Sequence, residues 1–178
     1  MYDIAVVMDA DNVTVPGFLS EVNRAYSAGV QAMQAHRTGK NLNTDIALLD
    51  GVSEEINNGF FRSGHNALGL SAGLAGSGMA FDYFWYYDAV QSLETAGEDK
   101  ELELTLLECG MHTVYLENLP VYDEKTQKKR ISNGIFIRTI WTIRKRVQDS
   151  LPEIVTVLQK QEKKRLRNYL KEHKKRIL

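Results

Sequence analysis

The sequence has few of the features that mark small secreted or membrane proteins. Its 178 residues include one cysteine, Cys109, and three prolines, so an internal disulfide is excluded. No stretch approaches the roughly 18 consecutive apolar residues of a membrane span, and the N-terminus lacks the basic and apolar regions of a leader. We therefore expect a soluble chain without a targeting segment, and a Cys109 buried in a helix core, as free cysteines usually are.

Its composition is that of an ordinary globular protein, but its charge is unevenly distributed. The chain is 43% hydrophobic and 25% charged, with a formal net charge of −1. Residues 1–125 hold 19 Asp or Glu and 6 Lys or Arg, whereas residues 126–178 hold 4 and 16. The acidic body predicts no nucleic-acid binding and is a suitable host for cations. The basic segment predicts either peripheral contact with an anionic membrane surface or a solvated helix, because its apolar face is thin.

Two carboxylates follow the first apolar segment, Ile4 to Met8. Side chains alternate along a strand, so an extended Asp9-Ala10-Asp11 would direct both carboxylates the same way, as a clamp for a divalent cation. Ligands in open α/β sheets bind outside the carboxyl ends of strands, which favours this position. The alternative is that Asp11 or Asn12 forms a side-chain-to-backbone turn or caps the next helix.

The rest of the chain alternates between predicted helices and strands. Apolar residues recur at three- to four-residue steps in the helical segments, and short apolar segments between them predict strands. The predicted helices are 16–28, 43–60, 83–93, 98–110, 131–147 and one from 152 onward, and the predicted strands include 4–8, 30–36 and 113–116. The second helix is indicated by apolar residues at helical spacing, namely Ile46, Leu49, Val52 and Ile56. This order indicates an α/β domain over residues 1–150 and a basic helical tail over 151–178.

Two further segments are candidates for a functional site. Gly69 to Phe81 is rich in Gly, Ser and Ala, and such small residues permit another group to approach the backbone closely. We predict a loop that leads into a strand and forms the wall of a site, with a flexible connector as the alternative. Glu98 and Asp99 stand at the start of a predicted helix, where they serve either as a general base or as ordinary first-turn acids.

Taken together, these segments resemble family 2 glycosyltransferases of the GT-A fold. The resemblance covers residues 1–125 and follows the family from its DxD strand onward, so we expect a truncated domain that lacks the opening strands around the nucleotide base. The residues that carry it are Ile4 to Asn12, Gln34, Leu68 to Ser71, Gly76 to Phe81, Gly97-Glu98-Asp99 and Val121 to Lys125.

The resemblance implies a metal-dependent, inverting transfer of sugar from a nucleotide-sugar donor to the hydroxyl of a glycan or lipid-linked acceptor. Asp9-Ala10-Asp11 is similar to the family's DxD motif, in which Asp11, supported by Asp9, holds Mn or Mg against the donor diphosphate. Asp99, with Glu98 beside it, is similar to the base that deprotonates the acceptor. The residues implied to border the substrates are Asp9, Gln34, Gly76, Ser77, Gly78 and Met79.

The same resemblance implies a role in polysaccharide or cell-envelope biosynthesis, in the cytoplasm at the inner face of the membrane. Two alternatives stay open. Asp9-x-Asp11 after an N-terminal strand is also similar to the first motif of haloacid-dehalogenase-like phosphatases, in which Asp9 would be the nucleophile. A non-catalytic remnant of a glycosyltransferase is the third hypothesis.

Overall fold

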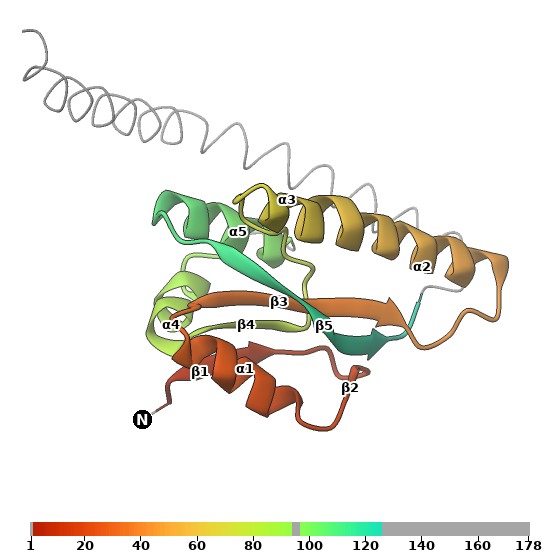
Figure 1. The fold of residues 1–178 in the computed structure, drawn as a ribbon, viewed down its shortest axis with the longest axis horizontal. Coiled ribbons are helices and arrows are strands. Elements are labelled where there is room, and N and C mark those ends of the chain that lie inside the picture. Colours follow the sequence, from red (N-terminus) through yellow and green to blue (C-terminus); the bar gives the residue numbers. More distant parts are fainter. Residues whose placement is uncertain (1, 94–96, 126–178) are drawn as a thin grey trace, which may run out of the picture. The chain divides into compact units, whose positions relative to one another are not determined.

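The computed structural model describes residues 2–93 and 97–125, which form a mixed α/β arrangement around a five-stranded sheet (Figure 1). The strand order is β1-β4-β3-β5-β2. The strands are β1 (Ile4–Val7), β2 (Val13–Thr14), β3 (Ala32–Gly39), β4 (Met79–Asp82) and β5 (Thr113–Asp123). The helices are α1 (Phe18–Ser27), α2 (Asp45–Asn57), the π-helical turn η1 (Asn58–Gly64), α3 (His65–Ala67), α4 (Tyr83–Val90) and α5 (Glu98–Glu108).

The pairing of the strands places several chain ends at one edge of the sheet. β3 and β5 run parallel, and their last residues, Gly39 and Asp123, are partners. β4 is antiparallel to both β1 and β3, so its first residue, Met79, pairs with Val7 at the end of β1. The segments that follow β1, β3 and β5 and the loop that precedes β4 therefore lie at the same edge.

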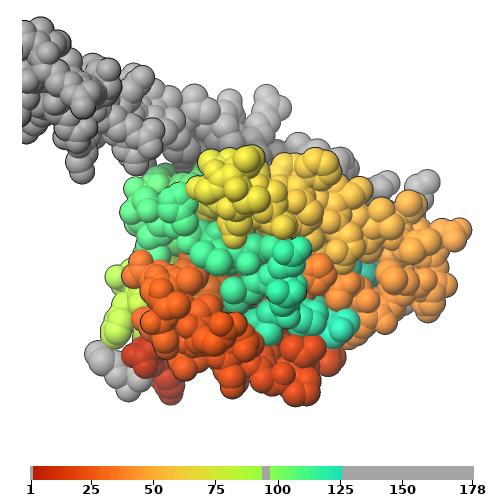
Figure 2. All heavy atoms as spheres, viewed as in Figure 1, coloured from red at the N-terminus to blue at the C-terminus, as the bar shows by residue number. Residues whose placement is uncertain are grey.

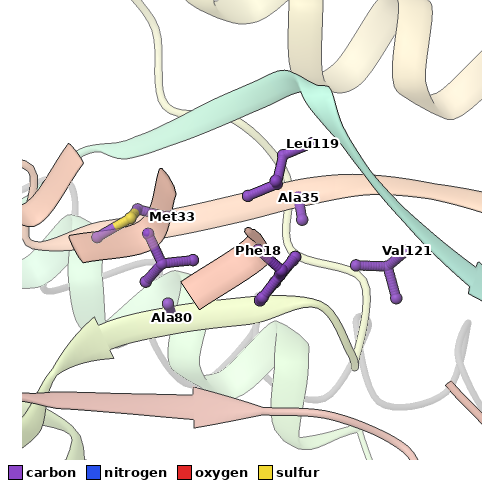
Figure 3. Close-up of a cluster of buried hydrophobic side chains, with 7 residues drawn as sticks. Phe18, Met33, Ala35, Ala80, Leu119 and Val121 are labelled. Carbon is purple, nitrogen blue, oxygen red and sulfur yellow. The ribbon is translucent and has the colours of Figure 1, made fainter. Parts of the chain in front are cut away.

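Alternating side chains of the central strands build one apolar core on each face of the sheet. Met33 and Ala35 of β3 pack with the buried Phe18 and Val22 of α1, and Figure 3 shows Phe18, Met33 and Ala35 within this cluster. On the other face Ala32 belongs to a second cluster, which also contains Leu74, Met79, Phe81, Ala89, Leu102 and Leu106. Figure 1 shows α1 on one side of the sheet and α2, α3 and α5 on the other.

Most of the predicted elements are present, with differences at their ends. α1 begins at Phe18 after Gly17, a residue with φ of 84° that offers no side-chain cap. The predicted strand at 113–116 continues to Asp123, with an irregularity in its pairing between Ala35 and His36. The segment expected as one helix over 43–60 is α2 followed by the wider turn η1.

One prediction of burial is wrong. Cys109, expected in a helix core, is exposed because it lies one residue beyond the last turn of α5. The apolar residues that indicated α2 in the sequence are largely exposed, with Leu49 at 69%, Val52 at 48% and Ile56 at 52% of their reference areas. The helix instead buries its small residues, Ala47 and Gly51, against the rest of the fold.

The remaining sequence-based predictions of organisation fall outside the described residues. These are the helix at 131–147, the domain boundary near residue 150 and the basic tail over 151–178. Among the residues that are described, no helix combines the length and apolarity needed to cross a membrane.

Candidate functional site

The carboxylates of Asp9 and Asp11 lie in a turn that follows β1, not in an extension of the strand. β1 ends at Val7, and the backbone N–H of Asn12 donates to the carbonyl of Asp9 at 3.0 Å. The side chain of Asn12 accepts from the Asp9 N–H at 3.1 Å. The expectation of an extended Asp9-Ala10-Asp11 is therefore wrong, and the alternative of a side-chain-to-backbone turn at Asn12 is confirmed. We call residues 9–12 the aspartate turn.

The aspartate turn is tied to the ends of β3 and β5. The N–H of Glu124, just beyond β5, donates to Asp11 Oδ2 at 3.0 Å. Lys40, just beyond β3, donates from Nζ to the Asp11 carbonyl at 2.7 Å, and its own N–H donates to the Asp123 carbonyl at 2.9 Å. These contacts hold Asp11 at the sheet edge while leaving both aspartates exposed.

Next to this turn lies the segment Gly73 to Gly78, which we call the glycine loop. Three of its consecutive carbonyls each accept a hydrogen bond from a basic side chain of a different element. The donors are Arg62 of η1 to Gly73, Lys100 of α5 to Leu74 and Arg37 of β3 to Ala75. These three hydrogen bonds define the conformation of the loop backbone and favour a wall over a flexible connector.

Gln34 of β3 holds the other half of the glycine loop. Its side chain, which is 0% exposed, accepts from the Ala75 N–H at 2.9 Å and donates to the Ser77 and Gly78 carbonyls at 3.0 and 3.3 Å. A buried amide with this many backbone partners stabilises one loop conformation. The structure thus places Gln34 at the glycine loop, where its side chain bonds to backbone groups of the loop.

The other residues predicted to border the substrates occupy this loop and the start of β4. Gly76 and Gly78 have φ of 76° and 66°, a region that disfavours residues with a Cβ. A Cβ on Gly78 would also lie 3.3 Å from Val121. Ser77 and Met79 are buried, so in this structure Gly76 and the half-buried Ala75 are the more accessible part of the loop.

Asp99 lies in the first turn of α5, beside the glycine loop. In the same turn Lys100 Nζ donates to the Leu74 carbonyl at 2.9 Å, and Glu103 Oε2 of the next turn accepts from the Leu74 N–H at 3.2 Å. Burial raises the pKa of the Asp99 carboxyl, and the nearby charge of Lys100 opposes this effect without reversing it. Glu98 is exposed at the start of the helix.

The basic residues of the body contact the candidate site, and the sequence analysis did not single them out. Residues 1–125 hold only 6 Lys or Arg. Five of them contact the glycine loop, the aspartate turn or the strand end between them, namely Arg37, Lys40, Arg62, Lys100 and Lys125. The sixth, Arg24, pairs with Glu21 on α1. The scarcity of basic residues in an acidic body was the signal available in the sequence.

Arg37 is the basic residue with the most connections to the site. It donates to the Ala75 carbonyl and pairs with the carboxylate of Asp123. Burial opposes its charge, but Glu54 and Asp123, joined by Asp9, outweigh burial and raise its pKa. The guanidinium therefore stays charged beside the aspartate turn.

The carboxylates of the aspartate turn suit a cation that arrives together with phosphate. In residues 2–93 and 97–125, no group of three or more His, Cys, Asp or Glu is arranged to hold a metal. Mg²⁺ is commonly held by one or two carboxylates together with substrate phosphates and water. Asp9 and Asp11, both exposed, fit a cation shared with substrate phosphates. They do not form a site built from protein ligands alone.

An apolar groove of about 600 Å³ lies between the end of β3 and the exposed face of α2. Leu42, Val52, Ile56 and Phe60 supply much of its lining, together with the backbone of Gly39. Figure 2 shows another face of the molecule, where β5 reaches the surface between α1 and the segment from α2 to α3.

Comparison with known protein families identifies a matching family. A family model described as "Glycosyl transferase family group 2" matches residues 4–160. The match extends beyond residue 125, where the sequence resemblance was expected to end. No curated protein matches the chain.

Proposed function

The chain belongs to glycosyl transferase family group 2, and from this premise we propose that it carries out metal-dependent, inverting sugar transfer from a nucleotide-sugar donor to an acceptor hydroxyl. Its mixed α/β fold fits a partial GT-A-like domain, and the family decides against the phosphatase alternative. The observation that carries the proposal is the position of Asp11, bound to the end of β5 at the sheet edge that also holds the glycine loop.

In this proposal the donor diphosphate binds at the aspartate turn. Asp11, supported by Asp9, would hold Mn or Mg, and the cation would neutralise negative charge on the departing nucleoside diphosphate. The hydrogen bond from the Glu124 N–H to Asp11 Oδ2 orients the carboxylate. Lys40, on the Asp11 carbonyl, fixes the backbone of the same residue.

Asp99 is the proposed general base. It would take the proton of the acceptor hydroxyl while that oxygen attacks the anomeric carbon and the bond to the diphosphate oxygen breaks. A carboxylate with a raised pKa is a better proton acceptor near neutral pH than an ordinary aspartate, and burial supplies that shift here. Glu98 adds negative charge next to the base.

The glycine loop is the proposed wall between donor and acceptor. Gly76 would present its backbone to the substrates, the buried Ser77, Gly78 and Met79 would lie behind it, and Gln34 would act by holding that backbone in place. The acceptor that we propose is a glycan or a lipid-linked sugar. We also propose that the basic residues of 151–178 draw the protein to an anionic membrane surface on the cytoplasmic side.

Calorimetric titration with UDP tests the proposal through Asp11. With Mn²⁺ present, the full chain should bind UDP, and Asp11→Asn should weaken this binding at least tenfold because one charged ligand is lost. Asp45→Asn, which removes an exposed acid from the first turn of α2, should bind as the unmodified chain does. If UDP does not bind, or if its binding is independent of Mn²⁺ and unchanged in Asp11→Asn, the non-catalytic remnant is the better hypothesis.

A further inference from the structure

Five charged side chains form a continuous series of alternating sign, which we call the charge chain. Its order is Arg62, Glu54, Lys125, Asp123 and Arg37. Arg62 Nη1 lies 2.6 Å from Glu54 Oε1, Glu54 Oε2 lies 3.6 Å from Lys125 Nζ, and Lys125 Nζ lies 3.0 Å from Asp123 Oδ1. Asp123 Oδ2 then pairs with Arg37 Nη2.

Both ends of the charge chain attach to the glycine loop. Arg62 Nε donates to the Gly73 carbonyl at 3.2 Å, and Arg37 Nη1 donates to the Ala75 carbonyl. The members come from β3, from the consecutive elements α2 and η1, and from the end of β5, so the series links three separate parts of the chain to two positions of one loop.

The charge chain is also connected to the aspartate turn. Asp123 is the last residue of β5, and the next residue, Glu124, donates its N–H to Asp11 Oδ2. Three cations and two anions leave one excess positive charge, and Arg37 interacts electrostatically with Asp9. Arg37 is thus the member that bonds to the glycine loop through Nη1 and to Asp123, next to the residue that binds Asp11, through Nη2.

We propose that Arg37 is a positioning residue that holds the glycine loop and the aspartate turn in a single arrangement, so that donor diphosphate and acceptor meet a preformed site. This role rests on the proposed function. A guanidinium suits it because its separate N–H groups reach two acceptors in fixed directions, whereas a lysine ammonium is a compact point charge. The side chain is 16% exposed, so Arg37 acts mainly through Ala75 and Asp123.

Amide hydrogen exchange in the full chain tests the positioning role without any ligand. In Arg37→Gln, exchange at 74–78 should rise at least tenfold, while the core amides of β4 and α5 change much less. In Arg37→Lys, which keeps the charge, the exchange rate of the loop should lie between those of the unmodified chain and Arg37→Gln. Arg24→Gln, the matched control on α1, should leave the loop unchanged. A uniform rise across loop and core, or no rise in the loop, would overturn the proposal.

A double variant keeps the test valid if Arg37→Gln alone does not fold, since that change leaves the buried Asp123 with less positive charge around it. Arg37→Gln combined with Asp123→Asn removes both charges of the pair and should still show faster exchange in the glycine loop. Slow, unchanged loop exchange in this folded double variant would contradict the positioning role.

UDP titration with Mn²⁺ separates this inference from the proposed function. We expect Arg37→Gln to weaken UDP binding at least tenfold and Arg37→Lys to restore part of it. If the unmodified chain does not bind UDP, the proposed function fails, while loop exchange still decides whether Arg37 positions the loop. If the unmodified chain binds UDP and Arg37→Gln binds it equally well, only the positioning role fails.

Discussion

At the scale of single residues, Asp82 shows how one side chain fixes the passage from strand to helix. It is the last residue of β4, and its Oδ1 accepts from the N–H groups of Phe84 and Trp85 at the start of α4. Its Oδ2 accepts from the Tyr26 hydroxyl at 2.8 Å, which connects α4 to α1. The hydrogen bond from the Trp85 N–H is the main cause of the lowered pKa of Asp82.

We expect Asp82→Ala to lower the free energy of unfolding at pH 7 by about 1 kcal/mol, the usual cost of losing a helix cap. Because the folded pKa is lowered, this contribution is present above the unfolded value of about 3.9 and is lost as pH falls through the folded pKa. Urea unfolding at pH 7 and at pH 3 measures the difference. The account would be contradicted if Asp82→Ala lost the same free energy of unfolding at pH 7 and at pH 3. It would also be contradicted if Asp88→Ala, on the same helix, lost as much as Asp82→Ala.

Asp99 is expected to affect activity and stability in different directions. Its pKa is raised by burial, so the ionised carboxylate is less favourable in the folded chain than in the unfolded chain at neutral pH. Asp99→Asn should therefore unfold at the same or higher urea concentration, while nucleoside diphosphate release from the donor falls on the order of 10²- to 10⁴-fold, as expected for loss of a general base. Glu108→Gln, at the other end of α5, should change neither. Loss of stability above about 1 kcal/mol would indicate a structural role instead.

At the scale of secondary-structure elements, α2 presents an apolar face to the outside. Leu49 and Ile56 are 69% and 52% exposed, so replacing them with Gln should change the free energy of unfolding by less than about 1 kcal/mol. The same change should reduce the binding of an apolar dye such as ANS, because exposed apolar side chains near the groove are removed. Leu106→Ala on α5, at a position that is 0% exposed, should cost about 2–5 kcal/mol. A large loss of stability in the α2 variant would show that this face is buried in solution.

The elements of the fold could be predicted better than the contacts between them. Helical periodicity located α1, α2 and α5, because spacing along a helix depends on local sequence. It could not show which face of α2 is covered, since that depends on elements far along the chain. The length of β5 was missed for a similar reason: Glu117 and Asn118 interrupt the apolar pattern, but pairing with β3 resumes at Pro120.

The candidate site was predicted as a set of segments but not as a geometry. The sequence pointed to the aspartate turn, the glycine loop and Asp99, because together they resemble the motifs of one glycosyltransferase family. It did not show that Gln34 holds the loop by bonds to residues more than forty positions away. Nor did it single out Arg37, whose partners Ala75 and Asp123 come together only when β3, β5 and the loop share one edge.

At the scale of the whole molecule, the distribution of charge leads to a test of membrane contact. Residues 126–178 hold 16 Lys or Arg and 4 Asp or Glu, and each basic residue near an anionic bilayer contributes about 1 kcal/mol. The full chain should sediment with phosphatidylserine vesicles at low salt and dissociate from them at high salt. It should not sediment with phosphatidylcholine vesicles. Replacing Lys163, Lys164, Arg165 and Arg167 with Gln should reduce this binding at least tenfold, whereas Arg24→Gln should not. Equal binding to neutral vesicles would contradict an electrostatic contact.

The arrangement of the sheet edge can be tested with Mn²⁺ as a paramagnetic probe in NMR spectra of the full chain. In the presence of UDP, bound Mn²⁺ should broaden most strongly the amide signals of Asp9 to Asn12, Ala75 to Gly78 and Glu124, and affect least those of α4, which follows the opposite end of β4. Asp11→Asn should abolish this selective broadening. Broadening centred elsewhere, or unchanged in Asp11→Asn, would contradict a metal and diphosphate site at the aspartate turn.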